Sequence, residues 1–134
     1  MKIRALMSES PHTIGEHQPV GEALRRMREH HVRHLPVLDG ARLVGLVSDR
    51  DVALAEMIGG KTHESLRVGD VMAPEPFSVT IDAEVVDVVA TMAQRKIGSA
   101  VVLDGTKVAG IFTTTDALHL LLRHLVLDDL RLTL

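Results

Sequence analysis

An internal repeat constrains the fold of this chain more than any other feature of its sequence. Shifting the 134 residues against themselves by 65 positions aligns residues 6–53 with residues 71–118 without a gap. The identical pairs are Met7/Met72, Pro11/Pro76, Val20/Val85, Met27/Met92, Val37/Val102, Leu38/Leu103, Asp39/Asp104, Gly40/Gly105, Gly45/Gly110 and Asp51/Asp116. Self-similarity at one fixed offset predicts two copies of a single supersecondary unit.

Each copy contains the same order of predicted elements, β-α-β-β-α, which places the chain in the α+β class. A short extended segment, at residues 12–14 and 77–79, precedes a helix with apolar residues at helical spacing. We expect Pro19 in the first turn of the first helix and Asp82 as the N-cap of its counterpart. The closing helices are predicted at residues 51–58 and 116–126.

Two β-hairpins are predicted between these helices, because each copy has an Asp-Gly turn between runs of apolar residues. The hairpin strands are residues 35–38 and 43–47 in the first copy, and 100–103 and 108–112 in the second. One copy of about 55 residues buries too little surface to be stable alone. We therefore expect the copies to pack sheet against sheet about a pseudo-two-fold axis. The expected organisation is repeat 1 at residues 1–60, a linker around 59–65, repeat 2 at 66–127 and a tail at 128–134.

Charge and composition narrow the function classes. A net charge of −3 gives no electrostatic reason to expect nucleic acid or an anionic membrane as a partner. Phe77 and Phe112 are the only Phe, Trp or Tyr residues, so stacking platforms for single-stranded nucleic acid are not expected either. No cysteine is present, and no run approaches the ~18 apolar residues of a membrane span. Without an apolar signal region, a cytoplasmic protein is expected.

The two copies share a pattern of an apolar-Met pair, an apolar strand ending in Asp, and Gly-apolar-apolar-Ser/Thr-x-x-Asp. The first copy has Leu6-Met7, Leu35-Pro36-Val37-Leu38-Asp39 and Gly45-Leu46-Val47-Ser48-Asp49-Arg50-Asp51. The second has Val71-Met72, Ala100-Val101-Val102-Leu103-Asp104 and Gly110-Ile111-Phe112-Thr113-Thr114-Thr115-Asp116. This pattern resembles the CBS (cystathionine-β-synthase) domain over nearly the whole chain. One departure is Val101, where the family usually has proline.

The resemblance implies a regulatory module rather than an enzyme, with two symmetry-related clefts that bind AMP, ADP, ATP or another adenosyl ligand such as S-adenosylmethionine. It also implies a homodimer that signals to a separate protein, whose identity the sequence does not give. No other cofactor is expected. The alternative is a structural adaptor with empty clefts that acts only through protein–protein contacts.

Asp51 and Asp116 are the main candidates for ligand contact. A carboxylate can accept hydrogen bonds from both vicinal hydroxyls of a ribose. The same residues also match a helix capping box, because Ser48-x-x-Asp51 and Thr113-x-x-Asp116 have its spacing. Spacing alone does not separate the two interpretations, and one side chain could serve partly in both.

Further candidates surround these aspartates. Hydroxyls and a cation at a helix start suit a phosphate, although they could equally be solvated loop groups. By resemblance, each cleft takes its second wall from the opposite copy. One cleft would contain Ile111, Thr113, Thr115 and Asp116 facing His12, Val32 and Arg33, and the other would contain Ser48, Arg50 and Asp51 facing Phe77, Ile97 and Gly98.

The two clefts are expected to differ. The basic stretch at residues 30–34 lies near the cleft of Asp116, although it could also be a solvated helix end. Asp49 adds a carboxylate beside Asp51 that would repel a phosphate unless Arg50 offsets it. Asp116 is therefore expected to be the stronger ribonucleotide contact.

Metal binding and catalysis are not expected. The eight histidines have no Cys partner and no His-Glu-x-x-His frame, and no motif positions a nucleophile with a base. The C-terminal leucines suggest a contact surface. Leu118, Leu121, Leu122, Leu125 and Val126 form an apolar helical face, followed by alternating Leu130, Leu132 and Leu134. These residues are expected to divide between the domain core and a dimer seam.

Overall fold

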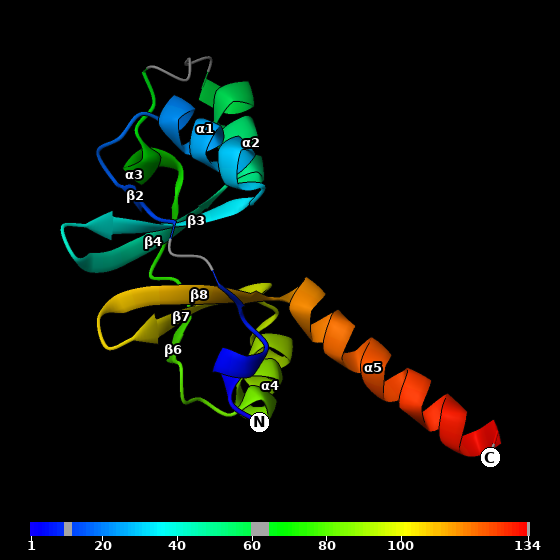
Figure 1. Cartoon of the computed structure of the whole chain (residues 1–134). Helices are drawn as coiled ribbons and strands as arrows, with labels where there is room; N and C mark the ends of the chain where they lie inside the picture. The colour runs from blue at the N-terminus through cyan, green and yellow to red at the C-terminus, as the bar shows by residue number, and fades with distance from the viewer. Residues whose placement is uncertain (10–11, 60–64, 134) are drawn as a thin grey trace. The chain divides into compact units, whose positions relative to one another are not determined.

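The computed structural model describes residues 1–9, 12–59 and 65–133, which form two units. The first unit contains β2 (Ile14–Gly15), α1 (Val20–His30), β3 (His34–Asp39), β4 (Arg42–Ser48), α2 (Asp49–Gly59), α3 (Val68–Val71) and β5 (Ala73–Pro74). The second contains the 3₁₀ helix η1 (Ile3–Ala5), β1 (Ser8–Glu9), β6 (Ser78–Thr80), α4 (Val85–Arg95), β7 (Ser99–Asp104), most of β8 (Lys107–Thr113) and α5 (Thr114–Thr133). Figure 1 shows these elements along the chain.

Each unit is built on one mixed sheet, with strand order β2-β3-β4-β5 in the first and β1-β8-β7-β6 in the second. The strands β2 and β3 are parallel and are joined through α1, whereas β3 and β4 form an antiparallel hairpin. Both predicted Asp-Gly turns are confirmed, since Gly40 and Gly105 have φ values of 62° and 63°. Glycine has no Cβ and enters this left-handed region without a steric penalty. The α+β class and the β-α-β-β-α order of each copy are confirmed.

The repeated apolar residues form the two hydrophobic cores. Val20, Ala23 and Met27 of α1 are buried against the first sheet, and Val85, Val88 and Met92 of α4 occupy the same places in the second unit. Two of the identities found at an offset of 65 residues, Val20/Val85 and Met27/Met92, are therefore core positions of equivalent helices.

The sequence did not predict which sheet receives the segment that leads into each copy. Ile3 of η1 is fully buried in the core of the second unit, and β1 pairs antiparallel with β8. In the same way, Val68 of α3 is buried in the core of the first unit, and β5 pairs with β4. Each leading segment thus completes the sheet of the other copy, which brings residues near position 8 close to the start of α5.

Several predicted helix boundaries are corrected. Helix α4 has Glu84 as its N-cap, not Asp82, whose carboxylate forms an ion pair with Arg4. Pro19 is the N-cap of α1 and precedes its first turn. Helices α2 and α5 begin two residues earlier than expected, directly after Ser48 and Thr113. Most of the expected linker, residues 60–64, lies outside the described residues.

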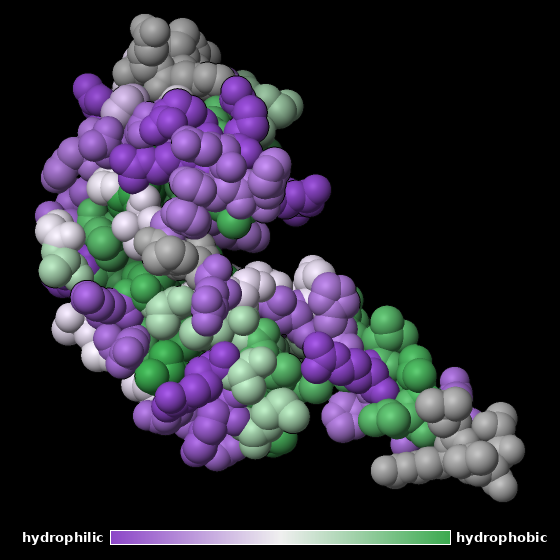
Figure 2. Space-filling model, viewed as in Figure 1, coloured by the Kyte–Doolittle hydropathy of each residue, from purple (hydrophilic) through white to green (hydrophobic). Residues whose placement is uncertain are grey.

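Helix α5 is longer than predicted and continues to Thr133, so the interpretation of residues 130–133 as alternating is wrong. Figure 1 shows it extending away from the end of β8, and Figure 2 shows apolar surface along it. Leu120 packs on the core of the second unit. The expected share of this face in the core is wrong for Leu118, Leu121, Leu122, Leu125 and Val126, which are all exposed, and their role as a dimer seam stays a prediction. In the described parts of the chain, no helix is both long and apolar enough to cross a membrane.

Candidate functional site

The start of α2 is held by a reciprocal pair of hydrogen bonds. The Asp51 amide donates to Ser48 Oγ at 3.0 Å, and the Ser48 amide donates to Asp51 Oδ2 at 3.0 Å. This is the geometry of a capping box, in which each side chain satisfies a backbone donor of the first helical turn. The capping interpretation of Asp51 is confirmed.

The start of α5 repeats this arrangement with additional bonds. Thr113 donates to Asp116 Oδ2 from its amide at 2.8 Å and from its hydroxyl at 3.1 Å, while the Asp116 amide lies 3.3 Å from Thr113 Oγ1. The other carboxylate oxygen, Oδ1, accepts a 3.1 Å hydrogen bond from Ser8 Oγ on β1. Asp116 is therefore also a cap. Because an ionised carboxylate has about four acceptor positions, capping and ligand contact are compatible, and the ligand role of both aspartates stays a prediction.

Backbone hydrogen bonds bring the turn after the preceding helix to each of these helix starts. His31 and Lys96, with φ of 55° and 56°, end α1 and α4 in the left-handed conformation. The following residues then accept bonds from the next helix, from the Asp49 amide to the Arg33 carbonyl at 3.2 Å and from the Thr114 amide to the Gly98 carbonyl at 3.0 Å.

Within the first unit the structure therefore brings Arg33 close to Ser48, Arg50 and Asp51. Within the second it brings Gly98, next to Ile97, close to Thr113–Asp116. The pairing of each helix start with residues of the opposite copy stays a prediction.

The remaining residues predicted to contact a ligand differ in their neighbours and in their exposure to solvent. His12 precedes β2 and stacks on His30, with ring centroids 3.5 Å apart. Phe77 precedes β6 and lies 5.4 Å from the Arg95 guanidinium carbon, which is a cation–π distance. The exposure of the remaining residues differs: Arg50 and Thr115 are exposed, Val32 and Ile97 are half-buried, and Ile111 is buried.

Two hollows each include a predicted site residue, His12 in one and Ile97 in the other. A polar groove of about 390 Å³ in the first unit is lined by His12, Thr13, Arg25, Arg26, Glu29 and His30. The positive charges of its two arginines are already balanced, because Arg25 pairs with Glu22 and Glu29 and Arg26 also pairs with Glu22. Hydrogen bonds from Arg25 and Arg26 lower the pKa of Glu22 to about 2.

The second hollow is apolar and lies beside the start of α5. It has a volume of about 140 Å³ and is lined by Val89, Met92, Ala93, Ile97, Thr114 and Ala117. Ile97 and Thr114 connect this hollow to the capped helix start. An apolar wall next to a hydrogen-bonding carboxylate is the usual combination in a small-molecule site.

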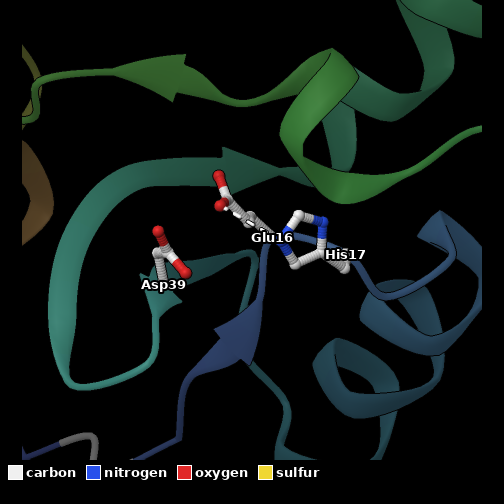
Figure 3. A group of neighbouring side chains, drawn as sticks. All are labelled: Glu16, His17 and Asp39. Carbon is white, nitrogen blue, oxygen red and sulfur yellow. Dashed lines mark ion pairs between the residues drawn. The ribbon is translucent and has the colours of Figure 1, made fainter.

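One group of side chains in the first unit has donor types that bind divalent metals. Figure 3 shows the carboxylates of Glu16 and Asp39 and the imidazole of His17, whose donor atoms all lie within 4.8 Å of one another. His17 Nε2 lies 3.4 Å from Glu16 Oε1, and Asp39 also lies 3.6 Å from an Arg42 nitrogen. The imidazole is 88% exposed, so bulk water competes for each of these donors.

Comparison with known proteins identifies the family. The model of the CBS domain matches residues 3–57 and again residues 68–123. The chain belongs to the CBS domain family. Both matches contain a capped helix start, with Asp51 in the first CBS domain and Asp116 in the second.

Relatives of this CBS protein include small bacterial proteins. It is 35% identical to the uncharacterized protein YlbB of Bacillus subtilis over 117 residues, covering 86% of this chain and 78% of YlbB. It is 25% identical to hypoxic response protein 1 of Mycobacterium tuberculosis over 126 residues, covering 93% and 88%.

Solved CBS structures share the fold. The CBS domain pair of protein MJ0100, in complex with 5′-methylthioadenosine and S-adenosyl-L-methionine, has a TM-score of 0.77 and 27% identity, covering 90% of this chain and 95% of that one. A hexameric CBS-CP12 protein from bloom-forming cyanobacteria has a TM-score of 0.77 and 26% identity, covering 88% and 69%.

Sequence reasoning missed Ser8, which contacts one of the two candidate carboxylates. The repeat alignment contained a signal for it, since the offset of 65 residues pairs Ser8 with Ala73, a hydroxyl with a methyl group. The difference between Ser8 and Ala73 points to a contact with Asp116 only once β1 is known to pair with β8, because that pairing brings Ser8 to the start of α5.

Proposed function

We propose that this CBS domain pair is a cytoplasmic regulatory module that binds an adenosyl ligand and signals to a separate protein. The ligand class is AMP, ADP, ATP or S-adenosylmethionine. The observation that carries the proposal is the structural relative MJ0100, whose CBS pair is in complex with two adenosyl compounds and whose likeness covers 90% of this chain.

The chemistry at the helix starts supports this ligand class. Carboxylates such as Asp51 accept hydrogen bonds from neighbouring ribose hydroxyls. The amides at the first turn of a helix favour a phosphate, because they point outward and lie at the positive end of the helix dipole. The apolar hollow beside α5 offers aliphatic side chains to a base.

Binding rather than catalysis is the role we assign to these groups. Asp51 and Asp116 accept hydrogen bonds from the first residue of their own capping boxes. This engagement suits them to hold a ligand in a fixed orientation. A general base instead needs to be within reach of a substrate proton and free to take it.

The signalling surface that we propose is the exposed apolar side of α5, which also favours homodimerisation. Leu118 and Leu122 remain 56% and 58% exposed, and Leu121 and Leu125 about as much. A continuous apolar stripe on one helix is typical of a protein–protein contact. The same stripe supports the second candidate function, a ligand-free adaptor that acts through this helix alone.

Isothermal titration calorimetry with AMP, ADP, ATP and S-adenosylmethionine tests the proposal. A regulatory ligand-binding module gives a saturable heat with at least one of these compounds. Absence of binding for all four, together with dimerisation in light scattering, would favour the adaptor function instead.

A further inference from the structure

The carboxylates at the two helix starts differ in how many acceptor positions are still open. Among the described residues, Asp116 accepts three hydrogen bonds, two on Oδ2 from Thr113 and one on Oδ1 from Ser8. Asp51 accepts one, on Oδ2 from the Ser48 amide. Each carboxylate oxygen has about two acceptor positions. Asp116 therefore keeps roughly one open position, whereas Asp51 keeps roughly three, including all of Oδ1.

Two hydroxyl bonds make this difference, one from Thr113 and one from Ser8, and the second comes from a side chain at equivalent places in the two sheets. Ser8 pairs with Ile111 in the second unit, and Ala73 pairs with Leu46 in the first. Both pairs are related by the same offset of 65 residues, so the backbone register is the same. Only the hydroxyl of Ser8 is missing in Ala73, and with it the hydrogen bond to the neighbouring aspartate.

The backbone holds both strands close to their partners, which keeps the side chain at this position near the helix start. Strand β1 approaches so closely at Gly110 that a Cβ atom there would lie 2.5 Å from the Ser8 carbonyl oxygen. Gly45 makes the equivalent close approach to Met72 and the Ala73 carbonyl. The hydroxyl of Ser8 is thus directed by strand pairing and not by a flexible loop.

We infer that Ser8 is a specificity-determining residue that makes the two CBS domains unequal: it restricts Asp116 to capping and leaves Asp51 as the main acceptor for the vicinal hydroxyls of a ribonucleotide. Binding both hydroxyls takes at least two open acceptor positions, which Asp51 has and Asp116 lacks. This ranking is the reverse of the one expected from sequence, where neighbouring charges favoured Asp116. The inference rests on the proposed function.

The test compares affinities for AMP and 2′-deoxy-AMP, since their ratio isolates the contact with the second hydroxyl and cancels changes in phosphate repulsion. Asp51→Asn keeps a side-chain oxygen that can accept from the Ser48 amide while removing the charge. It is expected to reduce the AMP to 2′-deoxy-AMP affinity ratio by roughly tenfold to a hundredfold, the value of a hydrogen bond to a charged group. Asp116→Asn is expected to change the ratio less than about threefold, because its single open position cannot hold both hydroxyls.

Exchanging the hydroxyl between the two strands tests the role of Ser8 itself. In the double variant Ala73→Ser with Ser48→Thr, which gives Asp51 the hydroxyl neighbours of Asp116, the ratio is expected to fall, because three of about four acceptor positions are then occupied. In Ser8→Ala the ratio is expected to become sensitive to Asp116→Asn. Ser8→Thr keeps the hydroxyl on a strand-compatible side chain and serves as the matched control, with the behaviour of the parent.

The outcomes separate this inference from the proposed function. If AMP binds and Asp51→Asn and Asp116→Asn lower the ratio equally, or Asp116→Asn lowers it more, the role of Ser8 is overturned while the ligand-binding function stands. The same holds if the double variant Ala73→Ser with Ser48→Thr leaves the ratio unchanged. If the parent binds neither nucleotide, the proposed function fails, and the assignment of a ribose acceptor fails with it.

Discussion

Replacing Gly110 by alanine is expected to destabilise the second unit by displacing β1. A Cβ atom on Gly110 would lie 2.5 Å from the Ser8 carbonyl oxygen and 3.0 Å from Met7 Sδ. Relaxed carbon–oxygen contacts are ~3.3 Å or longer, so β1 must retreat by about 0.8 Å. The obstructing atom is backbone, and among the described residues β1 pairs with β8 through Ser8 and Glu9. We expect a loss of ~1–3 kcal/mol, as for other overpacking substitutions.

Urea denaturation followed by circular dichroism measures this loss. With a slope of about 2 kcal/mol per molar urea, the midpoint should fall by roughly 0.5–1.5 M. Gly98→Ala is the matched control in the same unit, because its Cβ would meet nothing closer than Thr114 Oγ1 at 3.6 Å. That variant should be unchanged or stabilised by up to ~1 kcal/mol, since alanine restricts the unfolded chain. If Gly110→Ala is as stable as the parent, the close approach of β1 is refuted, and with it the placement of Ser8.

Three further substitutions test other parts of the structure. Phe112→Ala removes a fully buried ring and should lower the free energy of unfolding by ~3–5 kcal/mol in urea denaturation; a loss below ~1 kcal/mol would contradict its burial. The pKa of Glu22 is lowered from 4.5 to about 2 by arginine hydrogen bonds, so its stabilising effect is present above pH 4.5 and is lost as the pH falls toward 2. Glu22→Gln should flatten that part of the stability curve, and an unchanged curve would refute the ion pairs. Changing Leu121 and Leu125 together to glutamate should convert the proposed dimer to a monomer in light scattering, whereas an unaltered mass would place the seam elsewhere.

The elements predicted best from sequence are those determined by contacts close together in the chain. The Asp-Gly turns at Gly40 and Gly105 are local, because only the positive φ of the turn residue is required. The buried stripes of α1 and α4 follow from helical spacing within eleven residues. The capping boxes at Ser48 and Thr113 also depend only on residues three positions apart.

The features that sequence reasoning missed depend on distant partners. Asp82 is a residue type that often serves as an N-cap, but its carboxylate forms an ion pair with Arg4, which is distant in the sequence. The pairing of β1 with β8 joins residues about a hundred positions apart, and a repeat alignment compares equivalent residues without showing which sheet each strand joins. The hydrogen bond from Ser8 to Asp116 depends on that pairing. The sequence ranking of the two carboxylates therefore relied on neighbouring charges alone.

The most direct test of the central claim is an NMR titration of the ¹⁵N-labelled protein with AMP. Binding at the helix starts predicts saturable shifts of amides at residues 48–51 and 113–116, with the larger changes at residues 48–51. Ligand contact alters the hydrogen bonding around these amides, most of which donate to the capping side chains or to the carbonyls of Arg33 and Gly98. Shifts confined to residues 118–133 of α5, or a spectrum unchanged at millimolar AMP, would contradict the claim that this CBS domain pair binds an adenine nucleotide at its capped helix starts.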